Sequence, residues 1–188
     1  MKIKAVAALC SKVKQIVLYH EAGRQWAGDG MSAYLLPEAM GTLSTGALTA
    51  IFDIPTDKAA DMLIRDIPMP APYDTGDEGE EEEELRFDLG SSITYNGTEF
   101  LPLMTPDGRI YFIKIKYLRP ITDCEGLRLS LRRTDGGQPY IAAKDGMFLV
   151  AFIMPLLPRE YMREWLCDLH QGAEKTESRE KVKGDGEL

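Results

Sequence analysis

Apolar residues in the first part of the chain repeat first with the spacing of a helix and then with the spacing of strands. Residues 2–13 place apolar side chains at positions 3, 6, 7, 10 and 13, which predicts a helix with one buried face. Three segments of strand-like composition follow at 15–21, 24–27 and 31–36. Glycine-containing turns separate them, so this part of the chain predicts a helix followed by three strands joined by hairpin turns.

A second, shorter helix is expected before the middle of the chain. The apolar stretch at 47–52 leads into Pro55, and Thr56 or Asp57 can cap a helix that runs to about Ile64. Prolines, glycines and a block of carboxylates then interrupt the pattern, and such a composition buries too little apolar surface to fold alone. We interpret residues 68–85 as a mobile, solvated acidic loop. The alternative is an acidic patch that mimics nucleic acid or guards a basic groove.

The second half of the chain repeats the order of the first. A short helix over 115–124, which Pro120 limits to one or two turns, is followed by three strands. Further strands precede this helix, two of them around an Asn96-Gly97 turn. The strands are expected at 92–95, 99–104, 109–113, 127–132, 140–143 and 147–153. A helix followed by three strands in each half indicates an internal duplication, with halves at 1–67 and 86–158.

The predicted fold class is therefore α+β, with one domain over 1–158 and a separate segment over 159–188. The chain has 188 residues, 44% of them hydrophobic and 28% charged, which is typical of one globular domain. In the last segment, Tyr161, Trp165 and Leu169 are spaced as on the apolar face of an amphipathic helix. The mixed charge after this stripe predicts a frayed tail.

The net charge of −8 comes from one short stretch of the chain. Eight carboxylates and no base lie between Asp74 and Glu84, whereas the remaining 22 acidic residues balance 22 lysines and arginines. The acidity is therefore local, and it does not exclude an anionic partner for the folded part of the chain. No apolar run approaches the roughly 20 residues of a membrane span, and the apolar start is too short for a signal peptide. We expect a cytoplasmic protein.

The chain offers few groups for catalysis or metal binding. His20 lies in a strand pattern and His170 near the end, and neither has another ligand type at metal-binding spacing. The three cysteines are widely spaced, so we expect reduced thiols, with Cys10 and Cys167 packed on helices. No phosphate-binding loop, zinc-protease motif or hydrolase elbow occurs. We therefore predict a protein that is not an enzyme and has no cofactor and no metal.

Lysines and arginines cluster at two predicted helices, one before the three strands of each half. If the halves pack as a pseudo-twofold pair, these helices lie side by side and their cations line one surface. Such a surface neutralises the phosphates of duplex DNA without reading its bases. The other interpretation is that these are solubilising lysines on exposed helices. The residues concerned are Lys4, Lys12, Lys14, Lys114, Lys116 and Arg119.

Residues 117–158 resemble the end of a bacterial sliding clamp, the β subunit of DNA polymerase III. The resemblance is carried by Tyr117-Leu118, the strand patterns at 127–131 and 139–142, and the final Phe152-Ile153-Met154-Pro155. It covers under a quarter of the chain. The family implies a DNA-clamp-like domain of two βαβββ halves, with basic helices that contact phosphates nonspecifically. It also implies an apolar pocket at the Met-Pro segment that receives motifs of polymerases.

The resemblance implies a non-enzymatic accessory of DNA replication that binds duplex DNA and a polymerase or another replication protein. This chain has room for one clamp domain, so a six-domain ring would be a homo-oligomer of six copies. The chain also continues past the Met-Pro segment, so the last helix could cover the pocket or dock a partner. An interaction module that keeps the fold without binding DNA is the alternative. The residues expected to bind a protein partner are Met154, Pro155, Leu156, Tyr161, Trp165 and Leu169.

Overall fold

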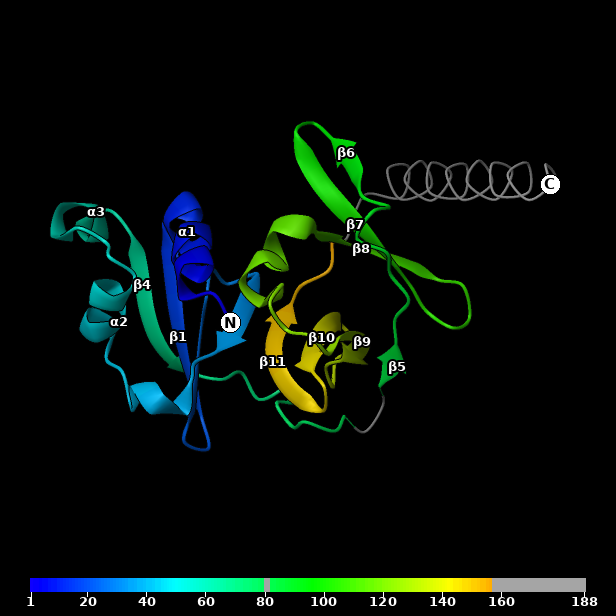
Figure 1. Cartoon of the computed structure of the whole chain (residues 1–188). Coiled ribbons are helices and arrows are strands. Elements are labelled where there is room, and N and C mark those ends of the chain that lie inside the picture. The colour runs from blue at the N-terminus through cyan, green and yellow to red at the C-terminus, as the bar shows by residue number, and fades with distance from the viewer. Residues whose placement is uncertain (80–81, 157–188) are drawn as a thin grey trace. The chain divides into compact units, whose positions relative to one another are not determined.

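The computed structural model describes residues 1–79 and 82–156, and its fold class is mixed α+β as the sequence predicts (Figure 1). The chain forms two compact units. The larger unit consists of the described residues of Met1–Leu85 and Lys116–Met154, and the smaller unit contains Arg86–Ile115 with Pro155 and Leu156. The C-terminal helix expected from residue 158 onward lies outside the described residues. None of the described helices is both long and apolar enough to cross a membrane.

The larger unit begins with the elements that its apolar pattern predicts. They are α1 (Ile3–Val13), β1 (Gln15–Glu21), β2 (Arg24–Gly28) and β3 (Ser32–Leu35). The turn between β1 and β2 holds Ala22 and Gly23 at φ values of 46° and 82°, as a tight hairpin turn of the primed type requires. In this part of the chain the turn residues and the apolar pattern of the strands thus favour the same structure.

The next part of the chain differs from its prediction in one respect. A 3₁₀ turn, η1 (Glu38–Met40), precedes α2 (Thr45–Ile51), and Ser44 caps α2 by accepting a hydrogen bond from the amide of Ala47 at 3.2 Å. The third helix, α3 (Thr56–Ala60), stops well before Ile64. Residues of its predicted second half form strand β4 (Leu63–Pro68), which pairs with β1 in parallel. Backbone pairing to a distant strand overrides the local helix pattern here.

The rest of the larger unit contributes short 3₁₀ turns and four strands, the first of them from the acidic segment. The predicted helix at 115–124 is replaced by η2 (Ile115–Tyr117) and η3 (Arg119–Ile121), with Pro120 inside the second turn. The strands are β5 (Glu83–Glu84), β9 (Leu127–Arg133), β10 (Pro139–Asp145) and β11 (Phe148–Ile153). Together with the first half they build one eight-stranded sheet in the order β4-β1-β2-β3-β11-β10-β9-β5. The halves therefore join through the antiparallel pair β3–β11.

One face of this sheet, the helix face, is covered by α1 and by the turns η2 and η3. Figure 1 shows α1 lying in front of β1. Val6, Ala7, Leu9 and Cys10 of α1 are buried. From β3, the hydroxyl of Tyr34 donates to the carbonyl of Tyr117 at 2.7 Å, which fixes the 3₁₀ turns over the same face. The helix face is therefore a continuous apolar layer whose outer surface is formed by helices.

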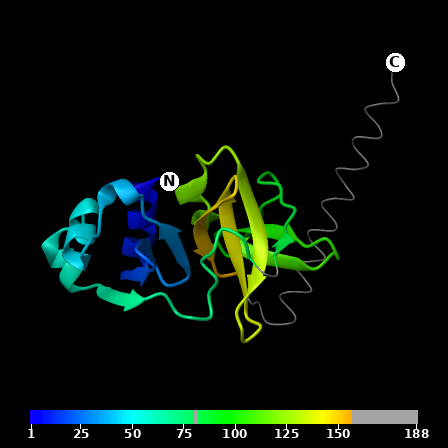
Figure 2. The same cartoon turned by 90° about the horizontal axis from the view of Figure 1, so that it is seen from below.

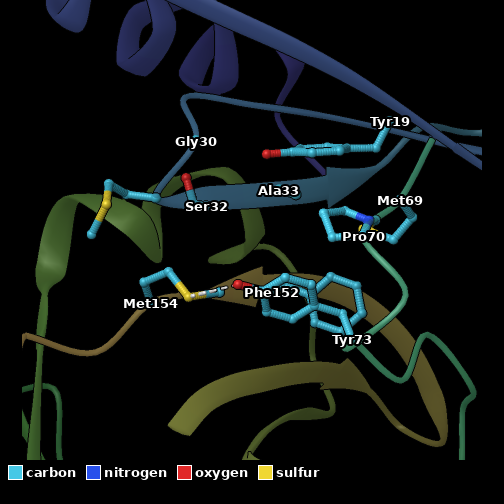
Figure 3. Close-up of a pocket in the computed structure, with 10 residues that line it drawn as sticks. Tyr19, Gly30, Ser32, Ala33, Met69, Pro70, Tyr73, Phe152 and Met154 are labelled. Atoms are coloured by element: carbon cyan, nitrogen blue, oxygen red, sulfur yellow. Dashed lines mark hydrogen bonds between the residues drawn. The ribbon is translucent and has the colours of Figure 1, made fainter. Parts of the chain in front are cut away.

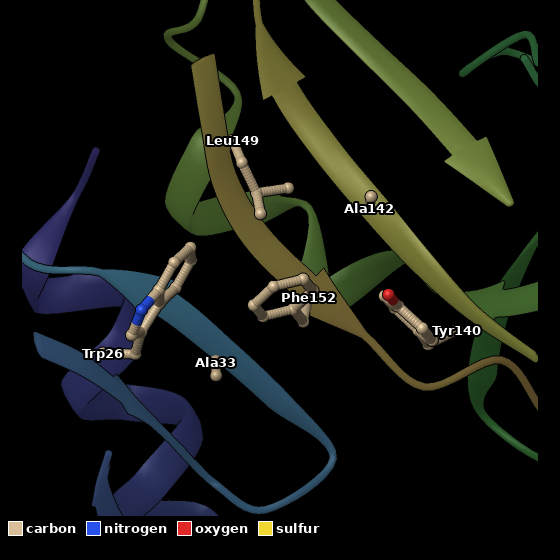
Figure 4. Close-up of a cluster of buried hydrophobic side chains, with 6 residues drawn as sticks. All are labelled: Trp26, Ala33, Tyr140, Ala142, Leu149 and Phe152. Atoms are coloured by element: carbon tan, nitrogen blue, oxygen red, sulfur yellow. The ribbon is translucent and has the colours of Figure 1, made fainter. Parts of the chain in front are cut away.

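The opposite face, the aromatic face, carries a cluster of large buried side chains (Figure 4). The rings of Trp26 and Phe152 lie 4.8 Å apart, and Tyr140 meets Phe152 edge-on at 5.6 Å. The cluster consists of Trp26, Ala33, Tyr140, Ala142, Leu149 and Phe152. Because β2 and β3 contribute from one half and β10 and β11 from the other, this cluster fastens the two halves together.

The acidic segment lies on the aromatic face, and this corrects the expectation of a solvated loop for residues 68–85. Its described residues run from β4 to β5 along the lower side of the sheet in the view of Figure 1, and Figure 2 gives a second view. Met69 and Tyr73 pack against the aromatic cluster, and Glu83–Glu84 pair with β9. The local composition gave the wrong prediction because the groups that hold the segment come from strands about fifty or more residues away in the sequence.

The smaller unit is a three-stranded antiparallel sheet. Its strands are β6 (Ile93–Tyr95), β7 (Thr98–Met104) and β8 (Ile110–Lys114), close to their predicted positions. Phe100, Ile110 and Phe112 form its core, with Leu156 packed against them. The sequence placed these strands within one half of a single domain, whereas their contacts form a separate unit.

Candidate functional site

The helix face carries most of the predicted DNA-binding cations. Lys4, Lys12 and Lys14 are exposed on α1 and at its C-terminal end, and Arg119 is exposed on η3. Lys116 is half-buried, with its ammonium 4.6 Å from the centre of the Tyr117 ring, a cation–π distance. Each of these cations therefore belongs to the layer of helices that covers the larger sheet.

The N-terminal end of α1 lies directly against η3. The amide of Lys2 donates to the carbonyl of Pro120 at 2.7 Å, and the Lys2 ammonium donates to the hydroxyl of Thr122 at 2.7 Å. The chain's terminal ammonium lies 3.5 Å from the carboxylate of Asp123. These contacts hold the two predicted basic elements side by side. Lys114, the sixth predicted cation, lies on β8 in the smaller unit.

The positive charges on α1 are not neutralised by neighbouring carboxylates. Among the described residues, no ion pair involves Lys4, Lys12 or Lys14. Lys12 lies in the last turn of α1, where the helix dipole stabilises a cation. The helix carries no acidic residue in its first turn. We call Lys4, Lys12, Lys14, Lys116 and Arg119 the basic surface.

The aromatic face holds a small apolar pocket that contains Met154, one of the predicted partner-binding residues (Figure 3). Tyr19, Ala33 and Phe152 line it from the sheet, while Met69, Pro70 and Tyr73 line it from the acidic segment. Its volume is about 40 Å³, which is room for a small apolar group only. The Tyr73 hydroxyl donates to the Met154 sulfur at 3.8 Å and so joins two of its walls.

The other predicted partner-binding residues do not join this pocket. Pro155 and Leu156 belong to the smaller unit, where the amide of Leu156 donates to the carbonyl of Phe112 at 2.6 Å. Leu156 thus contributes to the core of that unit. Tyr161, Trp165 and Leu169 lie outside the described residues.

A buried charge cluster on the aromatic face was not predicted from the sequence. Arg132 is 2% exposed, and its guanidinium donates to the Glu82 carboxylate at 2.8 and 3.1 Å. The Lys144 ammonium lies 2.7 Å from the same carboxylate. Burial alone would raise the pKa of Glu82, but hydrogen bonds from Lys144, Ser130 and Arg132 outweigh it and lower the pKa to about 2. Glu82 is therefore a fixed anion between two buried cations.

The sequence contains a signal for this cluster. In β9, Arg128, Ser130 and Arg132 alternate with Leu127, Leu129 and Leu131. The leucines occupy the helix face, so the polar set must face the other side of the sheet. A polar row on a central strand needs a covering layer of opposite charge, and the acidic segment provides one.

The histidine and cysteines that the structure describes serve packing. His20 lies 2.5 Å from the carboxylate of Asp66, and its other ring nitrogen faces the amide of Gln25 at 3.3 Å. Both ring nitrogens are thus engaged. Burial raises the pKa of Cys10 to about 12 and that of Cys124 to about 11, which disfavours the reactive thiolate. Within residues 1–79 and 82–156, no three His, Cys, Asp or Glu side chains converge on a possible metal position.

Comparisons with models of protein families, with curated proteins and with solved structures find no match to this chain.

Proposed function

We propose that this protein is a non-enzymatic accessory of DNA replication that binds duplex DNA without sequence specificity through the basic surface. The observation that supports DNA binding most strongly is the exposure of Lys4, Lys12 and Lys14 on α1, with no carboxylate of the described residues paired to them. A helix that presents cations in this way contacts phosphate oxygens and reads no base edges. The excess negative charge lies elsewhere in the sequence, in the acidic segment.

The arrangement of the larger sheet supports the clamp-like interpretation. The first half supplies β4-β1-β2-β3, the second half supplies β9-β10-β11 with β5 of the acidic segment at the edge, and the two sets meet at β3–β11. Helical elements from both halves cover a single face and touch each other. Two features differ from a βαβββ repeat. The outer strand of the first half, β4, follows its three strands instead of preceding the helix, and the 3₁₀ turns η2 and η3 stand in place of the helix of the second half. In this proposal the helix face lies toward DNA, and a closed ring requires several copies of the chain.

A charge-reversal variant tests the basic surface. Lys4→Glu, Lys12→Glu and Lys14→Glu together should weaken binding to a random-sequence duplex at least 100-fold at low salt, measured by fluorescence anisotropy. Each phosphate contact contributes about −0.9 to the slope of log affinity against log salt. Loss of three contacts should therefore make this negative slope shallower by about 3. Thermal melting checks the fold, because a glutamate near the end of α1 costs about 0.3–1 kcal/mol.

A matched control removes the effect of net charge. The exposed residues Lys58, Arg65 and Arg86 do not belong to the basic surface, and their triple replacement by glutamate changes the charge by the same amount. This control should bind DNA within about threefold of the wild type. Equal loss of affinity in both variants would show that overall charge, and not the basic surface, governs binding.

A protein-interaction module is the second candidate function, and the pocket at Met154 favours it. The pocket is apolar, lies on the face of the sheet opposite the basic surface and includes three methionines and three aromatic rings among its walls. Methionine and aromatic side chains adapt to apolar partners. In this alternative the pocket receives a short segment of another protein, a polymerase or another replication factor, and DNA is not required.

A further inference from the structure

Residues 69–79, which we call the strap, contact the aromatic face in the manner of a bound peptide. Tyr73 is the anchor: its ring meets that of Tyr140 at 5.2 Å, nearly perpendicular, and lies 6.4 Å from that of Phe152. Its hydroxyl reaches Met154 (Figure 3). An aromatic ring set among two others and a methionine is the usual form of an interface anchor.

Side chains of the sheet bind the backbone of the strap. The Arg132 guanidinium donates to the carbonyls of Asp74, Gly76 and Asp77 at 3.0, 2.8 and 3.2 Å. The Tyr140 hydroxyl accepts a hydrogen bond from the amide of Asp74 at 3.1 Å. The strap forms no strand with the sheet, so its contacts are those of a segment lying across a preformed surface.

Carboxylates that follow the aromatic anchor complete the contacts. Asp77 accepts a hydrogen bond from the amide of Leu149 at 2.8 Å and lies 3.6 Å from the guanidinium of Arg24. Asp74 lies 3.8 Å from Arg132. The surface beneath the strap therefore offers an aromatic pocket followed by cations, which is complementary to a peptide with an aromatic residue followed by acidic residues.

We propose that the strap is an autoinhibitory occupant of this surface, and that the surface binds a partner peptide of the same chemistry, an aromatic residue followed by carboxylates. This inference rests on the second proposed function, the interaction module, and is independent of DNA binding. With Tyr73 and Met154 in place the pocket retains only about 40 Å³, so an incoming aromatic side chain must displace Tyr73. A tethered occupant acts at an effective concentration near the millimolar range, so it outcompetes a free peptide of similar affinity.

The test supplies the strap sequence in trans. A fluorescein-labelled peptide of residues 68–79, PMPAPYDTGDEG, is titrated with the full-length protein and followed by anisotropy. The variant Tyr73→Ala removes the internal anchor and should bind the peptide at least tenfold more tightly than the wild type. The same peptide with alanine in place of its tyrosine should not bind. Tyr111→Ala, which truncates a half-buried tyrosine of the smaller unit, is the matched control and should behave as the wild type.

A second variant keeps the test valid if Tyr73→Ala does not fold. Asp77→Ala removes the contacts with Leu149 and Arg24 while leaving Tyr73 in place, and it should also raise peptide affinity. If the peptide binds the wild type and both variants equally, the surface binds peptides but the strap does not inhibit it, and the inference is overturned. If neither folded variant binds the peptide, the interaction surface is overturned as well.

Discussion

The buried carboxylate of Glu82 should contribute a measurable part of the stability of the larger unit. In the variant Glu82→Gln, the shape is kept and the charge is lost, so Arg132 and Lys144 remain buried without their counter-ion. These two side chains are only 2% and 10% exposed, respectively, and solvent cannot replace the anion. Removal of one partner from a buried ion pair typically destabilises a protein by about 3–5 kcal/mol.

The pKa of Glu82 gives an independent magnitude. Folding lowers it from 4.5 to about 2, and each pKa unit corresponds to about 1.36 kcal/mol, so ionised Glu82 stabilises the folded state by roughly 3 kcal/mol. Since the folded pKa lies below the unfolded one, this stability is complete above pH 4.5. It is lost as the pH falls from about 4.5 toward 2. The variant should lack this component of acid unfolding.

Urea unfolding monitored by Trp26 fluorescence measures the effect. Trp165→Phe in every protein leaves Trp26, which is fully buried in the larger unit, as the only tryptophan. At pH 7 the midpoint of Glu82→Gln should fall by about 1–2 M urea, and the difference from the wild type should narrow toward pH 2. Glu84→Gln, an exposed carboxylate two residues along the chain, is the control and should change little. Equal midpoints for the two variants at pH 7 would refute the account of the charge cluster.

Two further predictions concern other buried groups. Tyr34→Phe removes the hydrogen bond to the Tyr117 carbonyl and should lower the free energy of unfolding by about 1–2 kcal/mol. The control Tyr19→Phe should change this free energy by less than about 0.5 kcal/mol. Urea titration of the two variants measures the difference. With the other two cysteines replaced by serine, Cys10 should react with a thiol reagent at pH 8 only as fast as the protein opens, and rapid labelling of the folded protein would contradict its burial.

Local patterns predicted the antiparallel strands well because their determinants are local. At the Asn96-Gly97 turn, φ values of 47° and 70° are those that the primed hairpin turn requires, and the flanking residues alternate. Strand β4 was missed because its partner, β1, lies more than forty residues earlier and no turn signal announces a parallel pairing. Its residues Leu63 and Ile64 therefore extended a helix pattern that ends at Ala60.

Of the candidate sites, too, one could be predicted from local spacing and the other depends on residues distant in the sequence. The cations of α1 follow from helical spacing alone, since residues off the apolar stripe must face outward. The charge cluster could not be read from the acidic segment, because Glu82 acquires its partners Arg132 and Lys144 from strands 50 and 62 residues later. The composition of a segment indicates whether it can fold by itself. The acidic segment instead packs on a surface formed by other parts of the chain, and its composition does not predict this.

The salt dependence of DNA binding by the wild-type protein tests the central claim most directly. Anisotropy titrations of a random-sequence duplex are made at several salt concentrations between about 50 and 200 mM. If the basic surface contacts three to five phosphates, the log affinity should fall linearly with log salt, with a slope of about −3 to −5, and equally for unrelated sequences. Absence of binding at 50 mM salt, or an affinity that does not change with salt, would contradict a DNA-binding role for the helix face.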